Sequence, residues 1–66
     1  MIINNHIKVF RQEHNVTQEE LAKSVNVSRQ TIIAIEKGNY TPSLLLAMQL
    51  SKFFKVRIEE LFEISK

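Results

Sequence analysis

The sequence predicts an all-α fold of five short helices. Its 66 residues include only one Gly and one Pro, so few positions interrupt helical structure. Ser, Thr and Asn, which favour helix ends, recur between stretches whose apolar residues are spaced as in a helix. Hydrophobic residues make up 44% of the chain and charged residues 24%, which is typical of a globular domain. We expect residues 1–66 to form a single compact domain.

The first helix is predicted over residues 5–14 and the second over about 18–25. Asn15 is suited to the left-handed conformation that ends the first helix, because Asn tolerates a positive φ. Thr17 precedes the second helix and has Glu20 three residues on, which is the pattern of a capping box. The side chains expected to face the core are Ile7, Phe10, Leu21, Ala22 and Val25.

A sharp turn at Asn26 leads into the third helix, predicted over about 29–37. Asn accepts the positive φ that a tight turn needs, and Ser28 is a favourable N-cap for the helix that follows. Gly38 marks the end of this helix, because glycine takes the left-handed conformation without steric cost. The inward side chains are expected to be Ile32 and Ile35.

The fourth helix is expected to open at Thr41 and to run to about Phe54. Thr41 would cap this helix and Pro42 would occupy its first position, where the missing N–H has no cost. Its inner row is predicted to be Leu44, Ala47, Leu50 and Phe54. Further apolar residues make this face wider than one small core can enclose: Leu45, Leu46, Met48 and Phe53.

A short fifth helix is predicted over about 57–62, and the segments 1–4 and 62–64 are expected to pair as a small two-stranded ribbon. Because the chain has no Cys, disulfides and thiolate zinc sites cannot stabilise its small core. Oligomerisation is the remaining way to stabilise so small a core, and we expect a homodimer. Candidate interface residues are Ile2, Ile3, Phe53, Ile58, Leu61, Phe62 and Ile64.

The second and third predicted helices, joined by a short turn, form the arrangement that places a recognition helix in the major groove of DNA. Arg29 and Gln30 lie on the expected outer face of the third helix. An Arg guanidinium donates bidentately to guanine, and a Gln amide matches the acceptor and donor of adenine. Ile33 and Ala34 can contact a thymine methyl group. The net charge of +2 favours a polyanion only mildly.

Contacts to DNA phosphates are expected from polar side chains around the recognition helix, because amides, hydroxyls and ammonium groups donate to phosphate oxygens. Gln18 opens the second helix, Lys8 lies on the first, and the others stand at or beyond the end of the third. The candidates are Lys8, Gln18, Lys37, Asn39, Tyr40 and Thr41.

These motifs together resemble the Cro and repressor-type helix-turn-helix regulators, also called the xenobiotic response element family. The resemblance covers nearly the whole chain and rests on Ile7-Lys8-x-x-Arg11, Thr17-Gln18-Glu19-Glu20-Leu21-Ala22, Val27-Ser28-Arg29-Gln30-Thr31-Ile32, Ile35-Glu36-Lys37-Gly38 and Pro42-Ser43. It implies a five-helix fold like that of the lambda repressor. The small stand-alone members that it resembles further imply a compact dimer with a terminal sheet.

The resemblance also implies roles for single residues. Ser28 and Thr31 join the DNA-facing positions, and Arg11 of the first helix forms an ion pair with Glu36 of the third. Two positions depart from the family pattern. Ile33 stands where relatives often have a polar residue, and Asn26 replaces the more common Gly in the turn, which its backbone geometry permits.

We therefore expect a homodimer that binds double-stranded DNA at a palindromic or near-palindromic operator and represses transcription by promoter occlusion. The alternative is a protein-interaction module of the same fold, such as an antitoxin or antirepressor partner, which would use the wide apolar face of the fourth helix.

An enzyme is not expected, because His6 and His14 have no Asp or Cys to orient or activate them. No cofactor, metal or small-molecule effector is indicated. No apolar run approaches the roughly 20 residues that span a bilayer. The first residues also lack the pattern of a signal peptide. We expect no membrane contact and a location in the prokaryotic cytoplasm and nucleoid.

Overall fold

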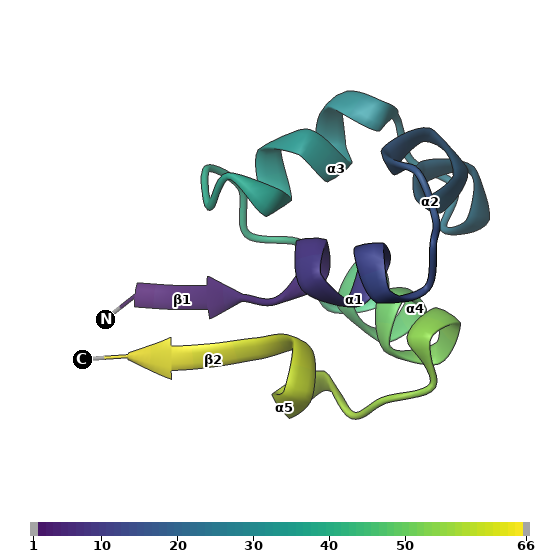
Figure 1. Cartoon of the computed structure of the whole chain (residues 1–66). Helices are drawn as coiled ribbons and strands as arrows, with labels where there is room; N and C mark the ends of the chain where they lie inside the picture. Colours follow the sequence, from purple (N-terminus) through teal and green to yellow (C-terminus); the bar gives the residue numbers. More distant parts are fainter. Residues whose placement is uncertain (1, 66) are drawn as a thin grey trace.

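The computed structural model describes residues 2–65, without the side chains of Ile2 and Ser65. The elements in chain order are β1 (Ile2–Asn5), α1 (Ile7–Glu13), α2 (Gln18–Ser24), α3 (Arg29–Glu36), α4 (Leu44–Phe54), α5 (Ile58–Leu61) and β2 (Phe62–Ser65). Figure 1 shows the helices gathered into one body, from which the two strands project side by side. The prediction of five helices with a terminal ribbon is confirmed. None of the described helices is long and apolar enough to cross a membrane.

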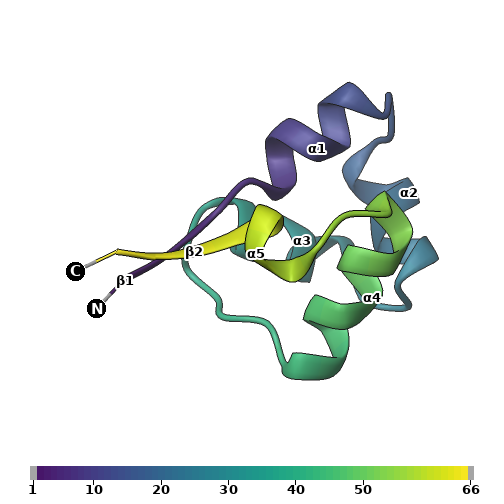
Figure 2. The ribbon, with the colours of Figure 1, turned by 90° about the horizontal axis from the view of Figure 1, so that it is seen from below.

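The ribbon is a two-stranded antiparallel sheet in which Ile3 faces Ile64 and Asn5 faces Phe62. Figure 2, seen from below, shows the same two strands running together away from the helices. The pairing explains two helix boundaries that differ from the prediction. The first helix begins at Ile7 because Asn5 is held in β1, and α5 ends at Leu61 because Phe62 is extended in β2.

The core takes a side chain from every helix. Its fully buried members are Ile7, Leu21, Ile32, Ile35, Leu50 and Leu61. All of the inward positions predicted for α2 and α3 are buried, and Phe10 of α1 packs against the core from its edge. Helix α3 is therefore fixed on its inner side by Ile32 and Ile35, one helical turn apart.

The start of α4 corrects the prediction. The N-cap is Ser43, whose hydroxyl accepts a hydrogen bond from the amide of Leu46 at 3.1 Å, so Thr41 and Pro42 precede the helix. The other predicted inner residues, Ala47, Leu50 and Phe54, are buried, so the inner face differs from the prediction only in the first turn. There Leu44 is 73% exposed, and Leu46 is buried with 5% exposure instead.

Among residues 2–65, four take a positive φ, and three of them are the predicted ones. Asn15, Asn26 and Gly38 have φ values of 55°, 59° and 80°. The fourth, Lys55, has φ 58° at the C-cap of α4 and has no sequence signal of this kind. A Cβ atom built at Gly38 would meet nothing within 4 Å, so its neighbourhood is open.

Candidate nucleic-acid interface

The helix pair α2 and α3 begins at two side-chain caps. Thr17 Oγ1 accepts from the amide of Glu20 at 3.0 Å, and the Glu20 carboxylate accepts from the amide of Thr17 at 2.8 Å, which completes the predicted capping box. The Thr17 backbone bond lowers the pKa of Glu20 below its ordinary value. Ser28 Oγ accepts from the amide of Thr31 at 3.2 Å. Both helices therefore have defined starting points on either side of Asn26.

The outer face of α3 carries the predicted base-contacting residues. Arg29 and Gln30 are exposed in its first turn, and Ile33 and Ala34 are half-buried four residues further along. Residues four apart lie on the same side of a helix, so these two pairs form one surface. This surface lies opposite the buried pair that fixes α3 to the core.

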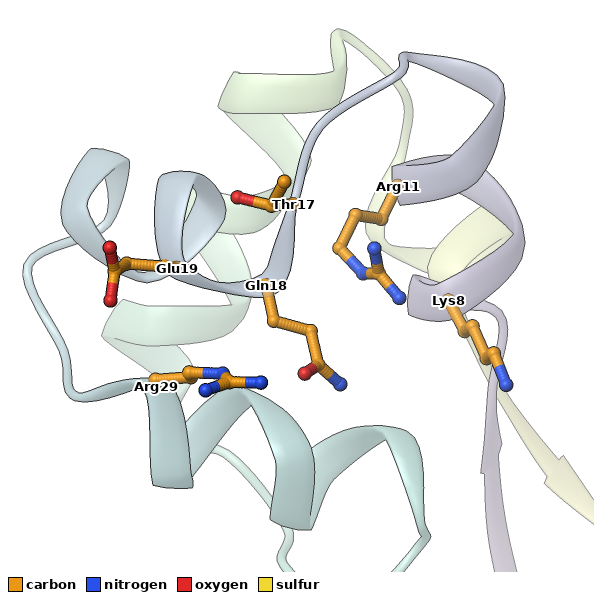
Figure 3. A pocket seen from close by; sticks show the side chains of 6 residues that line it. All are labelled: Lys8, Arg11, Thr17, Gln18, Glu19 and Arg29. Atoms are coloured by element: carbon orange, nitrogen blue, oxygen red, sulfur yellow. The ribbon is translucent and has the colours of Figure 1, made fainter.

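A hollow opens beside this surface, with a volume of about 520 Å³. Its lining comes from α1, the start of α2 and the start of α3: Lys8, Arg11, Thr17, Gln18, Glu19 and Arg29. Figure 3 shows the Gln18 amide lying between the Arg29 guanidinium and the Lys8 ammonium. Cationic side chains thus line the hollow from two helices, and Glu19 contributes a carboxylate to the same rim. Such a surface suits an anion.

A nearly buried ion pair holds α1, α2 and α3 together behind the hollow. Arg11 donates to Glu36 through Nε at 2.6 Å and through Nη2 at 3.3 Å. The two side chains are 12% and 5% exposed, and Arg11 also donates to the Val16 carbonyl at 3.0 Å. Gln18 Nε2 donates to Glu36 Oε1 at 3.1 Å, a contact that sequence reasoning missed. Glu36 therefore orients a side chain from each of the two other helices.

The end of α3 leads into the predicted phosphate-contacting loop. The amide of Gly38 donates to the Ile35 carbonyl and the amide of Asn39 donates to the Ala34 carbonyl, both at 2.9 Å. These two bonds form a Schellman turn, which reverses the chain after the helix. The four candidates from this segment are all exposed: Lys37, Asn39, Tyr40 and Thr41. Lys8 and Ser28 are exposed as well, and Thr31 is half-buried.

Asn5 contacts α3 and was missed by sequence reasoning, which placed it at the start of the first helix. Its Nδ2 donates to the Ile35 carbonyl at 2.7 Å, and its Oδ1 accepts from the amide of Ile7 at 3.2 Å. The second bond has a local signal, because an Asn two residues before a helical N–H often forms such a turn. The first bond joins residues 30 positions apart and has no such signal.

A second, apolar surface lies at the junction of the ribbon with α4 and α5. We call it the ribbon–α4 face, and its members are Ile3, Leu44, Met48, Ile58, Phe62 and Ile64. Ile3 and Ile64 are register partners, so their side chains lie on the same side of the ribbon. A hollow of about 180 Å³ joins the ribbon to α4, and Ile3, Leu44 and Phe62 help to line it.

The ribbon–α4 face differs in part from the predicted dimer interface. Leu61 was wrongly included, because α5 points it into the core and it is completely buried. Phe53 packs against the core, with its ring centroid 5.0 Å from that of Phe54. Ile2 lies in β1, but its side chain falls outside the described part.

The histidines lie away from the hollow beside α3. His6 Nε2 contacts the Glu63 carboxylate, and His14 Nδ1 contacts the Phe10 carbonyl at 2.8 Å. Within residues 2–65, no group of three or more His or Glu side chains is placed to hold a metal ion.

Known proteins share this architecture and much of the sequence. A family described as helix-turn-helix matches residues 7–61. An uncharacterized HTH-type transcriptional regulator of Methanocaldococcus jannaschii is 60% identical over 60 residues, with 91% of each chain covered. The cryptic phage CTXphi transcriptional repressor RstR of Vibrio cholerae is 37% identical over 60 residues, which are 91% of this chain and 54% of that protein.

A solved structure shows the same fold. The SOS-response transcriptional repressor LexA from Eubacterium rectale matches with a TM-score of 0.81 and 30% identity. The match covers 91% of this chain, which spans 64% of that chain's length. With the helix pair, its caps and the relatives in agreement, the chain belongs to the helix-turn-helix family of DNA-binding transcriptional regulators, of the Cro and repressor type.

Proposed function

We propose that the chain binds specific sequences of double-stranded DNA with α3 in the major groove. The observation that carries this is the division of α3 into two sides. Its inner side is fixed in the core, and its outer side exposes Arg29 and Gln30 in the first turn. In the proposal, Arg29 reads guanine and Gln30 reads adenine, and Ile33 and Ala34 offer apolar surface to a thymine methyl group.

The proposed phosphate contacts surround this helix. Lys8 and Gln18 reach one strand from the hollow beside α3, and the loop after Gly38 reaches the backbone from the other end of the helix. The cationic lining of the hollow supports the first set, and the exposure of the loop supports the second. The full set is Lys8, Gln18, Ser28, Thr31, Lys37, Asn39, Tyr40 and Thr41.

We further propose that two copies associate through the ribbon–α4 face. Ile64, Leu44 and Met48 are 69%, 73% and 54% exposed, and large apolar side chains that gather on one surface favour a partner. A two-fold dimer would present its recognition helices about 34 Å apart to successive major grooves, which calls for a palindromic or near-palindromic operator.

Repression by promoter occlusion is the simplest action for such a dimer. A protein bound over a promoter excludes polymerase without any further activity. The names of the Vibrio cholerae and Eubacterium rectale proteins, both repressors, support this choice. In this proposal the protein has no enzymatic activity and needs no cofactor. It acts in the prokaryotic cytoplasm and nucleoid.

Selection of bound DNA from a random pool tests the proposal directly. The expected result is a consensus with two-fold symmetry and half-sites one helical turn, about 34 Å, apart. A consensus without symmetry would refute the dimer but keep the DNA binding. Recovery of no enriched sequence, with binding that is weak and similar for all DNA, would refute specific recognition.

A second candidate function is a protein-interaction module, which the exposed α4 residues favour. Leu44, Leu45 and Met48 stand out from the first half of this helix. A module that only binds protein should show little salt-dependent affinity for random DNA, whereas a DNA-binding chain loses affinity steeply as salt rises. A salt titration with random duplex therefore separates the two functions.

A further inference from the structure

A side-chain hydrogen bond from the terminal ribbon reaches a backbone carbonyl group of α3. Ile35 O, in the last turn of α3, accepts from the Gly38 amide at 2.9 Å and from Asn5 Nδ2 at 2.7 Å. A carbonyl oxygen has two lone pairs, so both bonds can form together. One bond belongs to the Schellman turn and the other comes from β1.

The orientation of the Asn5 amide follows from its partners. The Ile7 amide can only donate, so it must face Oδ1, and the Ile35 carbonyl can only accept, so it must face Nδ2. Both polar ends of this partly buried side chain are therefore used inside the protein. One end holds the start of α1, and the other holds the end of α3.

Asn5 belongs to the strand face that also carries Ile3, Phe62 and Ile64. Its register partner is Phe62, and Ile3 lies two positions before it on the same strand. Alternate residues of a strand share one face, as do partners directly across an antiparallel pair. Asn5 thus stands at the inner end of the ribbon–α4 face, where that face meets α3.

The Schellman turn at the other end of this bond starts the exposed loop. Asn39 donates to the Ala34 carbonyl within the turn, and Tyr40 follows directly. A displacement of the Ile35 carbonyl would move the turn as a unit, because both turn bonds end in the last turns of α3. The loop position relative to the ribbon therefore depends on Asn5.

We propose that Asn5 is a positioning residue for DNA recognition, which holds the end of α3 and the loop after Gly38 in register with the terminal ribbon. The proposal rests on the proposed function for that loop, namely phosphate contact. Asn5 itself touches no DNA in this arrangement. It acts through the Ile35 carbonyl, and it gives the ribbon a direct influence on where Asn39 and Tyr40 stand.

The test uses Asn5→Ser, because a serine hydroxyl still forms the local turn to the Ile7 amide but is too short to reach Ile35. Asn5→Asp is a second variant, which keeps the local acceptor, replaces the donor by a second acceptor and adds a negative charge. We expect affinity for the selected operator to fall about tenfold, as for loss of one positioned hydrogen bond. The salt slope of binding should change little, because Asn39 and Tyr40 are uncharged and the slope counts cationic contacts to phosphate.

Two readouts separate positioning from general destabilisation. Backbone amide NMR signals of Gly38, Asn39 and Tyr40 should shift in Asn5→Ser, while those of α2 stay in place. The matched control is Ser51→Ala, which removes the bond from the Ser51 hydroxyl to the Val56 carbonyl, at the end of α4 away from α3 (Figure 1). That control should lower the melting temperature. At a temperature at which both proteins are folded, its operator affinity should stay within about twofold of the parent and its salt slope should be the same.

The proposal is overturned if Asn5→Ser binds the operator as the parent does, or if its losses equal those of Ser51→Ala. It is also overturned if both Asn5 variants lose affinity without any shift in the loop signals. Failure of the proposed DNA binding looks different, because the unsubstituted chain then fails to bind, and the positioning role falls with it.

Discussion

Replacing Glu36 by Ala should be the most damaging single change outside the apolar core. The Glu36 side chain is 5% exposed, and its carboxylate accepts from Arg11 Nε, Arg11 Nη2 and Gln18 Nε2. The substitution leaves the Arg11 guanidinium, itself 12% exposed, without its counter-charge. Only its bond to the Val16 carbonyl remains. An unpaired charge at a nearly buried position is the main source of the expected loss of stability.

Breaking one side of a buried ion pair costs about 3–5 kcal/mol. We expect a value near the lower end, about 3 kcal/mol, because Arg11 keeps one acceptor and is close enough to the surface to recruit water. A domain of this size has a total stability of about 3–10 kcal/mol. At about 4–8 °C per kcal/mol, the melting temperature should fall by about 12–24 °C. Operator affinity should fall too, because Gln18 loses the group that orients it.

Thermal and urea unfolding, followed by circular dichroism, measure this loss. Glu36→Gln is the milder variant that keeps the protein folded, since a Gln oxygen still accepts from Arg11 and only the charge is lost. Glu13→Ala is the matched control, because Glu13 is exposed at the end of α1 and its loss should cost less than about 0.5 kcal/mol. If Glu36→Ala melts within about 3 °C of Glu13→Ala, the pair contributes nothing measurable and the reasoning is wrong.

Three further predictions test other parts of the molecule. Arg29→Ala should cost about 1–3 kcal/mol of binding free energy on the selected operator and relax specificity at one base pair. Lys37→Ala should instead weaken binding to all sequences alike and lower the salt slope by about one. Equal losses of Arg29→Ala on operator and random DNA would contradict base reading. Lys55→Gly should raise the free energy of unfolding by about 1 kcal/mol, because it relieves a left-handed backbone, and a lower melting temperature would refute this. Leu44→Glu should shift the chain from dimer to monomer in sedimentation without lowering the stability of the monomer. The control Leu45→Glu should leave the dimer intact. If the dimer survives Leu44→Glu, it uses another surface.

The features that the sequence predicted well are those whose cause is local. The capping box of Thr17 and Glu20, the cap at Ser28 and the left-handed Gly38 each depend on a few adjacent residues. A hydroxyl before a helix or a glycine after one has the same effect in most proteins. The position of the recognition helix followed from these signals, together with the spacing of its apolar residues.

The features that the sequence did not predict depend on competition or on distant residues. Thr41 and Ser43 are both good caps, and the residue types alone do not decide between them; in the structure Ser43 caps α4, with Leu46 buried and Leu44 exposed. Lys55 adopts a left-handed conformation because α4 must turn there, not because lysine favours it. An apolar residue such as Leu61 suits the core and a dimer interface equally well, so its type does not distinguish the two. Its burial depends on how α5 packs against the rest of the core.

The candidate site also combines features with a local cause and features that depend on distant residues. Residue types and helical spacing identified the outer face of α3. The bond from Asn5 to the Ile35 carbonyl spans 30 positions, and the bond from Gln18 to Glu36 spans 18. Neither bond can be predicted from the residues next to it in the sequence, because the partner is set by which distant segment the fold brings close. Such contacts become visible only when the helices are placed in space.

The turn at Gly38 shows that a glycine can be required for its handedness and not for its small size. An added Cβ atom would find open space, so the constraint at this position is the φ of 80° alone. An L-alanine is strained there whatever room it has, whereas a D-alanine, the mirror-image residue, prefers that backbone region. A chemically synthesised chain with D-alanine at this position should therefore unfold at a higher temperature than the natural one, because its unfolded state has fewer conformations to gain.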